Sequence, residues 1–515
     1  YTDEANIPTL IDDLGTFFMF TQSGVLGLLD ERAMQSAGIT QVQQQPFLNL
    51  TGSGVLVGIV DTGIDYTNNV FRYEDGSTKI VSIFDMTIQG TPPYDFIIGT
   101  EFSREQINQA LQSDDPLSVV GEVDESGHGT FLASLAAGRR EGDFIGAAPD
   151  AELLVVKLKK ARPFYLRQYL VPPDQEYAFE STSVMVGIEY ILRKAQELGR
   201  PASICIGLGT NFGGHDNLSI FEQYINRVST LPGFCVSVAA GNEVNARHHY
   251  SGTIRNINQP NRVELRVGEN AGDIYVSIWN TAADRVSVSV TSPTGEVIER
   301  FPAADLGRLE TRLILEQSIV IIEYFFPTRG LGAQNTVIKI LKATEGIWSI
   351  NLYGEIILQG RFHMYLPIRG FVSPTVEFLE PDPYYTLLVP GTTLQAITVG
   401  GYNSLTNSLY ENSSWGPSRL DILGPDLVAP SVNVRGAFPR TGFGTMTGTS
   451  VGTAITTGAG ALFLQWGVVE ERYQAMCTCQ IRAYLIRGAT RFPDVVYPNE
   501  QWGYGILNLY ASFEA

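Results

Sequence analysis

Three short motifs, met in a fixed order along the chain, constrain this sequence more than any other feature. They are Asp61-Thr62-Gly63, Gly127-His128-Gly129-Thr130 and Gly448-Thr449-Ser450. Together they supply a carboxylate, an imidazole and a hydroxyl, and the small residues around them let the backbone approach a reacting centre closely. A single tripeptide of this kind arises by chance. All three in this order, each beside a suitable strand or helix, indicate one shared site.

The segments around the motifs predict where each side chain lies. Residues 55–60 form an apolar run that predicts a buried parallel strand, which delivers Asp61 at its carboxyl end, where sites form in α/β folds. His128 precedes a helical stretch of small residues, residues 130–137, and a second predicted helix, residues 449–466, begins beside Ser450. These three are the candidate catalytic residues. The alternative for His128 is a structural core histidine.

The chemistry of these side chains gives each a distinct role. Serine is a poor nucleophile until a base accepts its proton, and histidine, with an ordinary pKa of about 6.5, suits that transfer near neutral pH. An aspartate beside the histidine holds its tautomer and stabilises the imidazolium that forms. Ser450 is thus the expected nucleophile, His128 the base and Asp61 the orienting acid.

Apolar periodicity elsewhere predicts alternating strands and helices. Residues 152–158, 203–208 and 234–240 are strand-like, and residues 182–198 have a helical period that stops at Gly199. Strand, helix and strand at this spacing indicate βαβ units and a parallel sheet, the core of an α/β domain.

The sequence pattern changes after Tyr250 and interrupts the α/β core. Between residues 262 and 357, short strand-like runs follow one another without a convincing helix. The pattern is typical of an antiparallel β-sandwich or jelly roll, the alternative being a longer irregular part of the same domain. We expect an N-terminal arm or propeptide remnant at 1–30, a catalytic domain in two parts at 31–253 and 375–515, and an inserted β-domain at 254–374.

The order Asp, His, Ser is that of subtilisin, and the chain resembles the subtilisin-like serine peptidases, or subtilases. The resemblance runs from residue 55 to about residue 509, the β-rich insertion excepted. It implies a subtilisin-like parallel-sheet catalytic domain with an inserted antiparallel β-sandwich. It also implies that Asn242, at the end of the strand 234–240, donates to an oxyanion together with the Ser450 backbone N–H. The alternative is that Asn242 is only a turn residue.

Substrate-binding residues follow from the same resemblance. Residues 204–209 look like the edge strand that pairs with substrate and walls the S1 pocket, so Gly207, Leu208 and Gly209 are candidates. Glu243 occupies a place at the rim of that pocket in the family, where a carboxylate would attract Lys or Arg; a solvated surface acid is an equal alternative. Calcium sites are common in the family but lie in variable loops, so metal binding stays open. The chemistry itself requires no cofactor.

A narrower resemblance is to the clostridial germination-specific subtilases. It rests on Val155-Val156-Lys157-Leu158, on Tyr484-Leu485-Ile486-Arg487-Gly488-Ala489 and on the β-rich insertion. Those enzymes process the precursor of a spore-cortex lytic enzyme and carry a jelly-roll domain inserted in the catalytic domain. The resemblance implies a secreted or spore-associated protein of a Gram-positive bacterium.

Composition limits the partners. The chain has 35 basic and 54 acidic residues, a formal net charge of −19, which argues against nucleic acid as a partner. It contains no apolar stretch long enough to span a membrane, and its four cysteines are expected to be free thiols. The chain begins with Tyr1 rather than Met, and we expect this start to arise when the enzyme itself removes an upstream propeptide.

These observations predict a serine endopeptidase that hydrolyses peptide bonds through an acyl-enzyme on Ser450 and is itself autoprocessed, and the resemblance implies that it processes a protein precursor. The alternative is a pseudoprotease or binding module that keeps the subtilase fold and acts through the β-domain. A catalytically dead member would be expected to lose a triad residue, and this chain keeps Asp61, His128 and Ser450.

Overall fold

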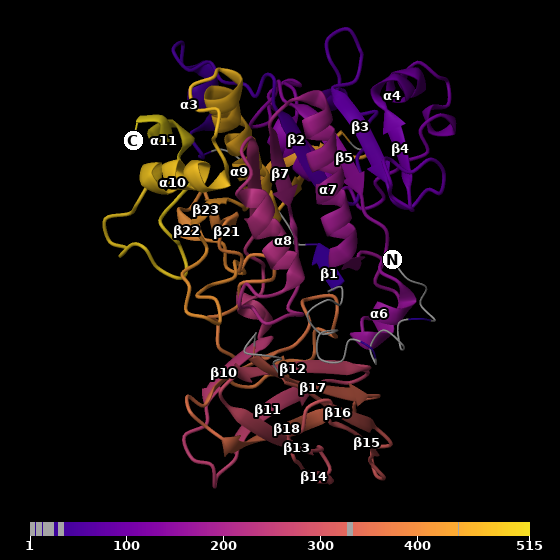
Figure 1. Cartoon of the computed structure of the whole chain (residues 1–515), viewed down its shortest axis with the longest axis vertical. Helices are drawn as coiled ribbons and strands as arrows, with labels where there is room; N and C mark the ends of the chain where they lie inside the picture. The colour runs from indigo at the N-terminus through magenta and orange to yellow at the C-terminus, as the bar shows by residue number, and fades with distance from the viewer. Residues whose placement is uncertain are drawn as a thin grey trace.

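The computed structural model describes residues 36–326, 333–440 and 442–514, together with Asn6, Asp13 and the backbone of Val25–Leu28. The remainder of the expected arm at residues 1–30 lies outside the described residues. Figure 1 shows a helix-covered sheet in the upper part of the molecule and a domain of strands at its lower end. The chain enters the lower domain from the α/β part and returns to it.

A mostly parallel sheet forms the centre of the α/β part. Its strand order is β22-β21-β9-β7-β2-β5-β3-β4, with β23 paired to β21. The parallel strands are β2 (Leu56–Asp61), β3 (Ile80–Asp85), β5 (Glu152–Lys157), β7 (Ala202–Ile206), β9 (Phe234–Ala239), β21 (Ile397–Asn403) and β23 (Leu427–Pro430). Antiparallel strands β4 (Thr100–Ser103) and β22 (Ser408–Leu409) lie at its two ends.

Helices cover both faces of this sheet. The helices of this part are α3 (Ile39–Gln44), α4 (Arg104–Leu111), α5 (His128–Ala137), α7 (Ser181–Leu198), α8 (Ile220–Ser229), α9 (Thr449–Leu464), α10 (Thr478–Gly488) and α11 (Leu509–Glu514), with α6 (Pro163–Gln168) set apart near the lower domain (Figure 1). In β2, Val57 and Ile59 share a core with α5 and α9, whereas Leu56 and Val60 share the other core with α7 and α8. Strands that are apolar on both faces need this double cover. No helix in the described part of the chain is long and apolar enough to cross a membrane.

The inserted domain consists of two antiparallel sheets packed face to face, as expected for a sandwich. Their strand orders are β10-β19-β12-β17-β16-β15 and β14-β13-β18-β11-β20. The strands are β10 (His249–Thr253), β11 (Asn261–Val267), β12 (Ile274–Thr281), β13 (Arg285–Thr291), β14 (Val297–Phe301), β15 (Arg308–Arg312), β16 (Ile319–Phe325), β17 (Ala333–Leu341), β18 (Gly346–Ile356), β19 (Arg361–Tyr365) and β20 (Glu377–Phe378). Inward residues such as Ile278, Val288 and Trp348 form a core of their own. Because β10 and β20 belong to these sheets, the strands extend a few residues beyond the expected limits, 254 and 374.

An apolar cluster joins the two domains. Tyr169, just after α6, and Phe212 of the α/β part meet Tyr275 of β12, with ring centroids 4.3 Å apart for Tyr169 and Phe212 and 5.3 Å for Phe212 and Tyr275. Phe371, beyond β19, extends the cluster. Aromatic rings in such contacts bury large apolar areas, so this cluster attaches the two domains to one another.

Two buried histidines lie where the β-domain contacts the segment that leads from its last strand back to the α/β part. His249 of β10 and His363 of β19 are neighbours, with 3.1 Å between His249 Nε2 and His363 Nδ1. His249 Nδ1 lies 3.0 Å from the carbonyl oxygen of Asp382, to which it donates in the neutral tautomer. Burial lowers the pKa of both imidazoles below the ordinary value, because the charged form loses its hydration.

We expect acid to destabilise the fold through this pair. In the unfolded chain both histidines take up protons with a pKa of about 6.5, whereas the folded protein keeps them neutral, so the free energy of unfolding falls as the pH drops below about 6.5. Urea unfolding at stepped pH values below neutrality measures the fall. The His363→Gln variant, which has one titrating group fewer, should show a shallower pH dependence; an unchanged dependence would contradict this account.

Candidate active site

The three motif residues meet at the carboxyl edge of the parallel sheet. Asp61 ends β2, His128 begins α5 and Ser450 is the second residue of α9. His128 Nδ1 lies 2.8 Å from Asp61 Oδ1, and His128 Nε2 lies 3.2 Å from Ser450 Oγ. With Nδ1–H donating to the carboxylate, Nε2 accepts from the serine hydroxyl. All three side chains are buried, and their hydrogen bonds place a carboxylate, an imidazole and a hydroxyl in series.

A buried carboxylate that the sequence analysis missed, Asp124, fixes two of the motifs relative to one another. Its Oδ1 accepts hydrogen bonds from Thr62 Oγ1 and Gly127 N, both at 2.8 Å. Its Oδ2 accepts from Thr130 N and Thr130 Oγ1, at 2.8 and 2.7 Å. The charge also lies at the N-terminus of α5, where the helix dipole favours it. An acidic residue four positions before His128 is the sequence signal that could have found it.

The same two motifs touch backbone to backbone. Thr62 Oγ1 accepts a hydrogen bond from Gly129 N at 2.9 Å. A Cβ atom added to Gly129 would lie 2.2 Å from the carbonyl oxygen of Gly63, a distance that no side chain tolerates. The glycine after His128 is therefore required by the close approach of the motif that carries Asp61.

Asn242 lies beside the first turn of α9. Its Oδ1 accepts hydrogen bonds from Thr449 N and Thr449 Oγ1 at 3.1 and 3.3 Å. Gly241 N in turn donates to Thr449 Oγ1 at 3.1 Å. Because Thr449 uses the oxygen of the carboxamide, Nδ2 is the end of the amide that can donate to an oxyanion. The Ser450 backbone N–H, at the start of the same helix, is placed where it could act as a second donor of this kind.

The expected substrate-binding strand pairs with a segment of the chain itself. β8 (Leu208–Gly209) pairs antiparallel with β1 (Val25–Leu28), and β1 pairs on its other side with β6 (Phe179–Glu180). Gly207, the residue before β8, lies close to the candidate nucleophile. A Cβ atom added to Gly207 would lie 3.2 Å from Ser450 Cβ. The two edges can therefore hold an extended peptide backbone directly beside Ser450.

The expectation for Glu243 is wrong in both of its forms. The residue is 3% exposed, so it is neither a solvated surface acid nor a charge open to a substrate side chain. Its Oε2 lies 2.9 Å from His248 Nδ1, and its Oε1 accepts a hydrogen bond from Arg369 N at 3.2 Å. The β-domain, inserted directly after this segment, supplies Arg369 and buries the carboxylate.

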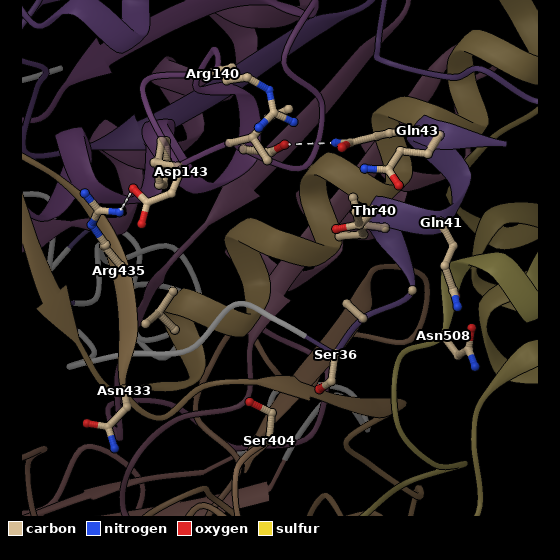
Figure 2. Close-up of a pocket in the computed structure, with 18 of the residues that line it drawn as sticks. Ser36, Thr40, Gln41, Gln43, Arg140, Asp143, Ser404, Asn433, Arg435 and Asn508 are labelled. Carbon is tan, nitrogen blue, oxygen red and sulfur yellow. Dashed lines mark hydrogen bonds and ion pairs between the residues drawn. The ribbon is translucent and has the colours of Figure 1, made fainter.

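A cavity of about 750 Å³ lies apart from this site. Figure 2 shows polar side chains around it, among them Gln43, Asn508 and the ion pair of Arg435 with Asp143. None of the three motif residues lines it, so its size does not mark the active site. Within the segments that the structure describes, no group of three His, Cys, Asp or Glu side chains could hold a metal ion, and we assign no calcium site.

Comparison with known proteins agrees with this geometry. The model of the subtilase family matches residues 52–294 and 380–505, and the gap between the two matches takes up most of the inserted domain. The chain belongs to the subtilase family. A solved structure of the CspB protease of Clostridium perfringens is similar to it, with 32% sequence identity, a TM-score of 0.82, and an alignment that covers 93% of this chain and 97% of that one.

Fold, site and similarity together define a subtilisin-like serine endopeptidase. Its fold and domain arrangement are similar to those of the clostridial CspB type, and the alignment covers almost the whole of both chains. The chemistry of subtilases needs no cofactor, and their substrates are proteins or peptides.

Replacing Asn242 with alanine should lower kcat by about 10²–10³-fold and change KM little, because the amide acts on the oxyanion formed in the transition state. Steady-state hydrolysis of a chromogenic peptide measures both constants. Asn245→Ala, three residues further on and at the surface, is the matched control and should behave like the unaltered enzyme. An effect confined to KM would place Asn242 in substrate binding instead.

Proposed function

We propose that Ser450 is the nucleophile of this endopeptidase, with His128 as general base and Asp61 as the orienting acid. The series of hydrogen bonds from Asp61 through His128 to Ser450, at 2.8 and 3.2 Å, carries the proposal. It joins three side chains that are far apart in the sequence in the geometry that triad chemistry needs.

In the first step Ser450 Oγ attacks the substrate carbonyl carbon while His128 Nε2 takes the hydroxyl proton, and the carbonyl oxygen becomes an oxyanion. The Asn242 amide and the Ser450 N–H stabilise that oxyanion. His128 then gives the proton to the leaving amine, which breaks the peptide bond and leaves an acyl-enzyme. A water molecule, deprotonated by the same imidazole, hydrolyses the ester and restores the serine. Asp61 stabilises the imidazolium in both halves of the cycle.

A fluorophosphonate probe should label the mature enzyme at Ser450, as mass mapping of the modified peptide would show. Ser450→Ala should abolish labelling and peptide hydrolysis together, because the attacking oxygen is gone. Ser408→Ala, in the exposed strand β22, should keep both activities. Labelling that survives in Ser450→Ala would refute the assignment, and an unaltered protein that takes up no probe would favour the pseudoprotease or binding-module alternative.

We further propose that the enzyme cuts its own propeptide, of which residues 1–30 contain a remnant. The strand β1 lies between β6 and β8, with Val25 opposite Glu180 and Gly27 opposite Gly209. An extended substrate makes the same antiparallel pairing at an edge strand. A segment tethered in this way reaches the active site without a bimolecular encounter, which favours an intramolecular cut.

Expression of the full precursor carrying Ser450→Ala, beside the active precursor in the same protease-deficient host, should show that only the active form is shortened. N-terminal sequencing and intact mass identify the ends of both products. Trimming of the Ser450→Ala precursor to the same N-terminus would mean that another protease makes the cut.

We propose a protein precursor as the natural substrate, and a secreted or spore-associated place of action in a Gram-positive bacterium. The similarity to the Clostridium perfringens CspB protease over 93% of the chain supports this proposal. So does the resemblance to germination-specific subtilases, which process the precursor of a spore-cortex lytic enzyme. If the purified enzyme hydrolyses a generic peptide but does not cleave such a precursor, the proposed substrate is refuted and the proposed peptide-bond hydrolysis is not.

A further inference from the structure

The buried carboxylate of Glu243 links the inserted β-domain to the proposed active site. Glu243 directly follows Asn242 in the chain. Its partners lie at the entrance and exit of the β-domain, His248 immediately before β10 and Arg369 shortly after β19. We propose that the Glu243–His248 pair is a positioning element. Through this pair, the β-domain holds the Asn242 amide at the correct position relative to Ser450. The inference rests on the proposed function of Asn242 as an oxyanion donor.

Burial makes this pair sensitive to geometry. The side chains of Glu243 and His248 are each 4% exposed, with 2.9 Å between Oε2 and Nδ1. Arg369 N donates to the other carboxylate oxygen at 3.2 Å. A buried carboxylate that loses a partner is strongly destabilised, because water does not replace the lost bond. The carboxylate, and with it the chain segment that carries it, therefore follows the position of the β-domain.

The β-domain in turn holds His248. The carbonyl oxygen of His248 accepts a hydrogen bond from Leu366 N at 2.9 Å, and Leu366 is the residue that follows β19. The next residue in the chain, His249, is the first of β10 and pairs with Tyr365 of β19. The connection from two β-domain strands to Glu243 thus passes only through adjacent residues and hydrogen bonds.

The catalytic domain holds the opposite side of the same segment. Ser414 Oγ accepts a hydrogen bond from Glu243 N at 3.0 Å, and Ser414 N donates to Gly241 O at 2.8 Å. Thr449 binds the side-chain oxygen of Asn242. Asn242 therefore lies between one anchor in the core and one in the β-domain. Since a misplacement of about 1 Å can cost about 10²-fold in rate, the second anchor bears on kcat.

His248→Phe, which removes the bond and keeps a planar ring, should lower kcat by about 10- to 100-fold with little change in KM. The same substitution in an Asn242→Ala background should lower kcat no further, because no amide is left to position. His248→Asn, whose side-chain N–H can replace the Nδ1–H donor, should recover most of the loss. Steady-state kinetics of the mature enzymes on one chromogenic peptide, with thermal unfolding of each variant, provides the readouts.

Arg361→Gln is the matched control. It removes the ion pair of Arg361 in β19 with Asp421, which joins the same two domains without touching the Asn242 segment, and should leave kcat unchanged. An equal loss from His248→Phe in both backgrounds would overturn the positioning role. If Asn242→Ala by itself leaves kcat unaltered, the oxyanion assignment fails and the positioning role fails with it.

A second variant covers the case in which His248→Phe does not fold. Glu243→Gln keeps the volume of the side chain and an oxygen that can accept from Arg369 N, but it removes the charge that faces His248. It should give a smaller loss of kcat that again disappears in the Asn242→Ala background. A loss that persists there, or no loss at all, would overturn the proposal.

Discussion

Cover on both faces of an apolar parallel sheet is the constraint on which the rest of this structure depends. The helices α5 and α9 pack on the face of β2 that carries Val57 and Ile59, and α7 and α8 pack on the other. The first pair of helices begins at the carboxyl edge of the sheet, where β2 ends in Asp61. Burial of the core thus brings three distant side chains together, and the proposed triad is a product of the same packing that stabilises the fold.

Polar contacts set the finer geometry that apolar packing leaves undetermined. Asp124 receives hydrogen bonds from Thr62, Gly127 and Thr130, and so fastens the turn after β2 to the start of α5. Buried polar groups gain most when they are hydrogen-bonded, and both oxygens of Asp124 have partners, which makes the arrangement specific. The direct approach of Gly129 to the Gly63 backbone adds a steric condition that a larger residue would break. Both devices act on the distance between the acid and the base.

The two domains are joined by contacts of different physical kinds, and these have different consequences. The ring cluster of Tyr169, Phe212 and Tyr275 removes apolar surface from water and contributes stability mainly through the area that it buries. The buried pair of Glu243 and His248 contributes less to net stability, because its desolvation offsets the attraction, but it demands one geometry. The first contact keeps the β-domain attached, and the second relates its position to the proposed oxyanion site.

Local patterns in the sequence determined the elements and the candidate triad. The predicted strand at 234–240 and helix at 182–198 agree with β9 and α7, because apolar periodicity depends on neighbouring residues alone. Tertiary structure alone decided that Glu243 is buried, that Asp124 bridges two motifs and that β1 lies between β6 and β8. Each of these depends on groups from distant parts of the chain, and no periodicity or composition records which of them will meet. Local motifs in the sequence therefore identified the candidate reacting groups, and long-range packing determined which residues surround and orient them.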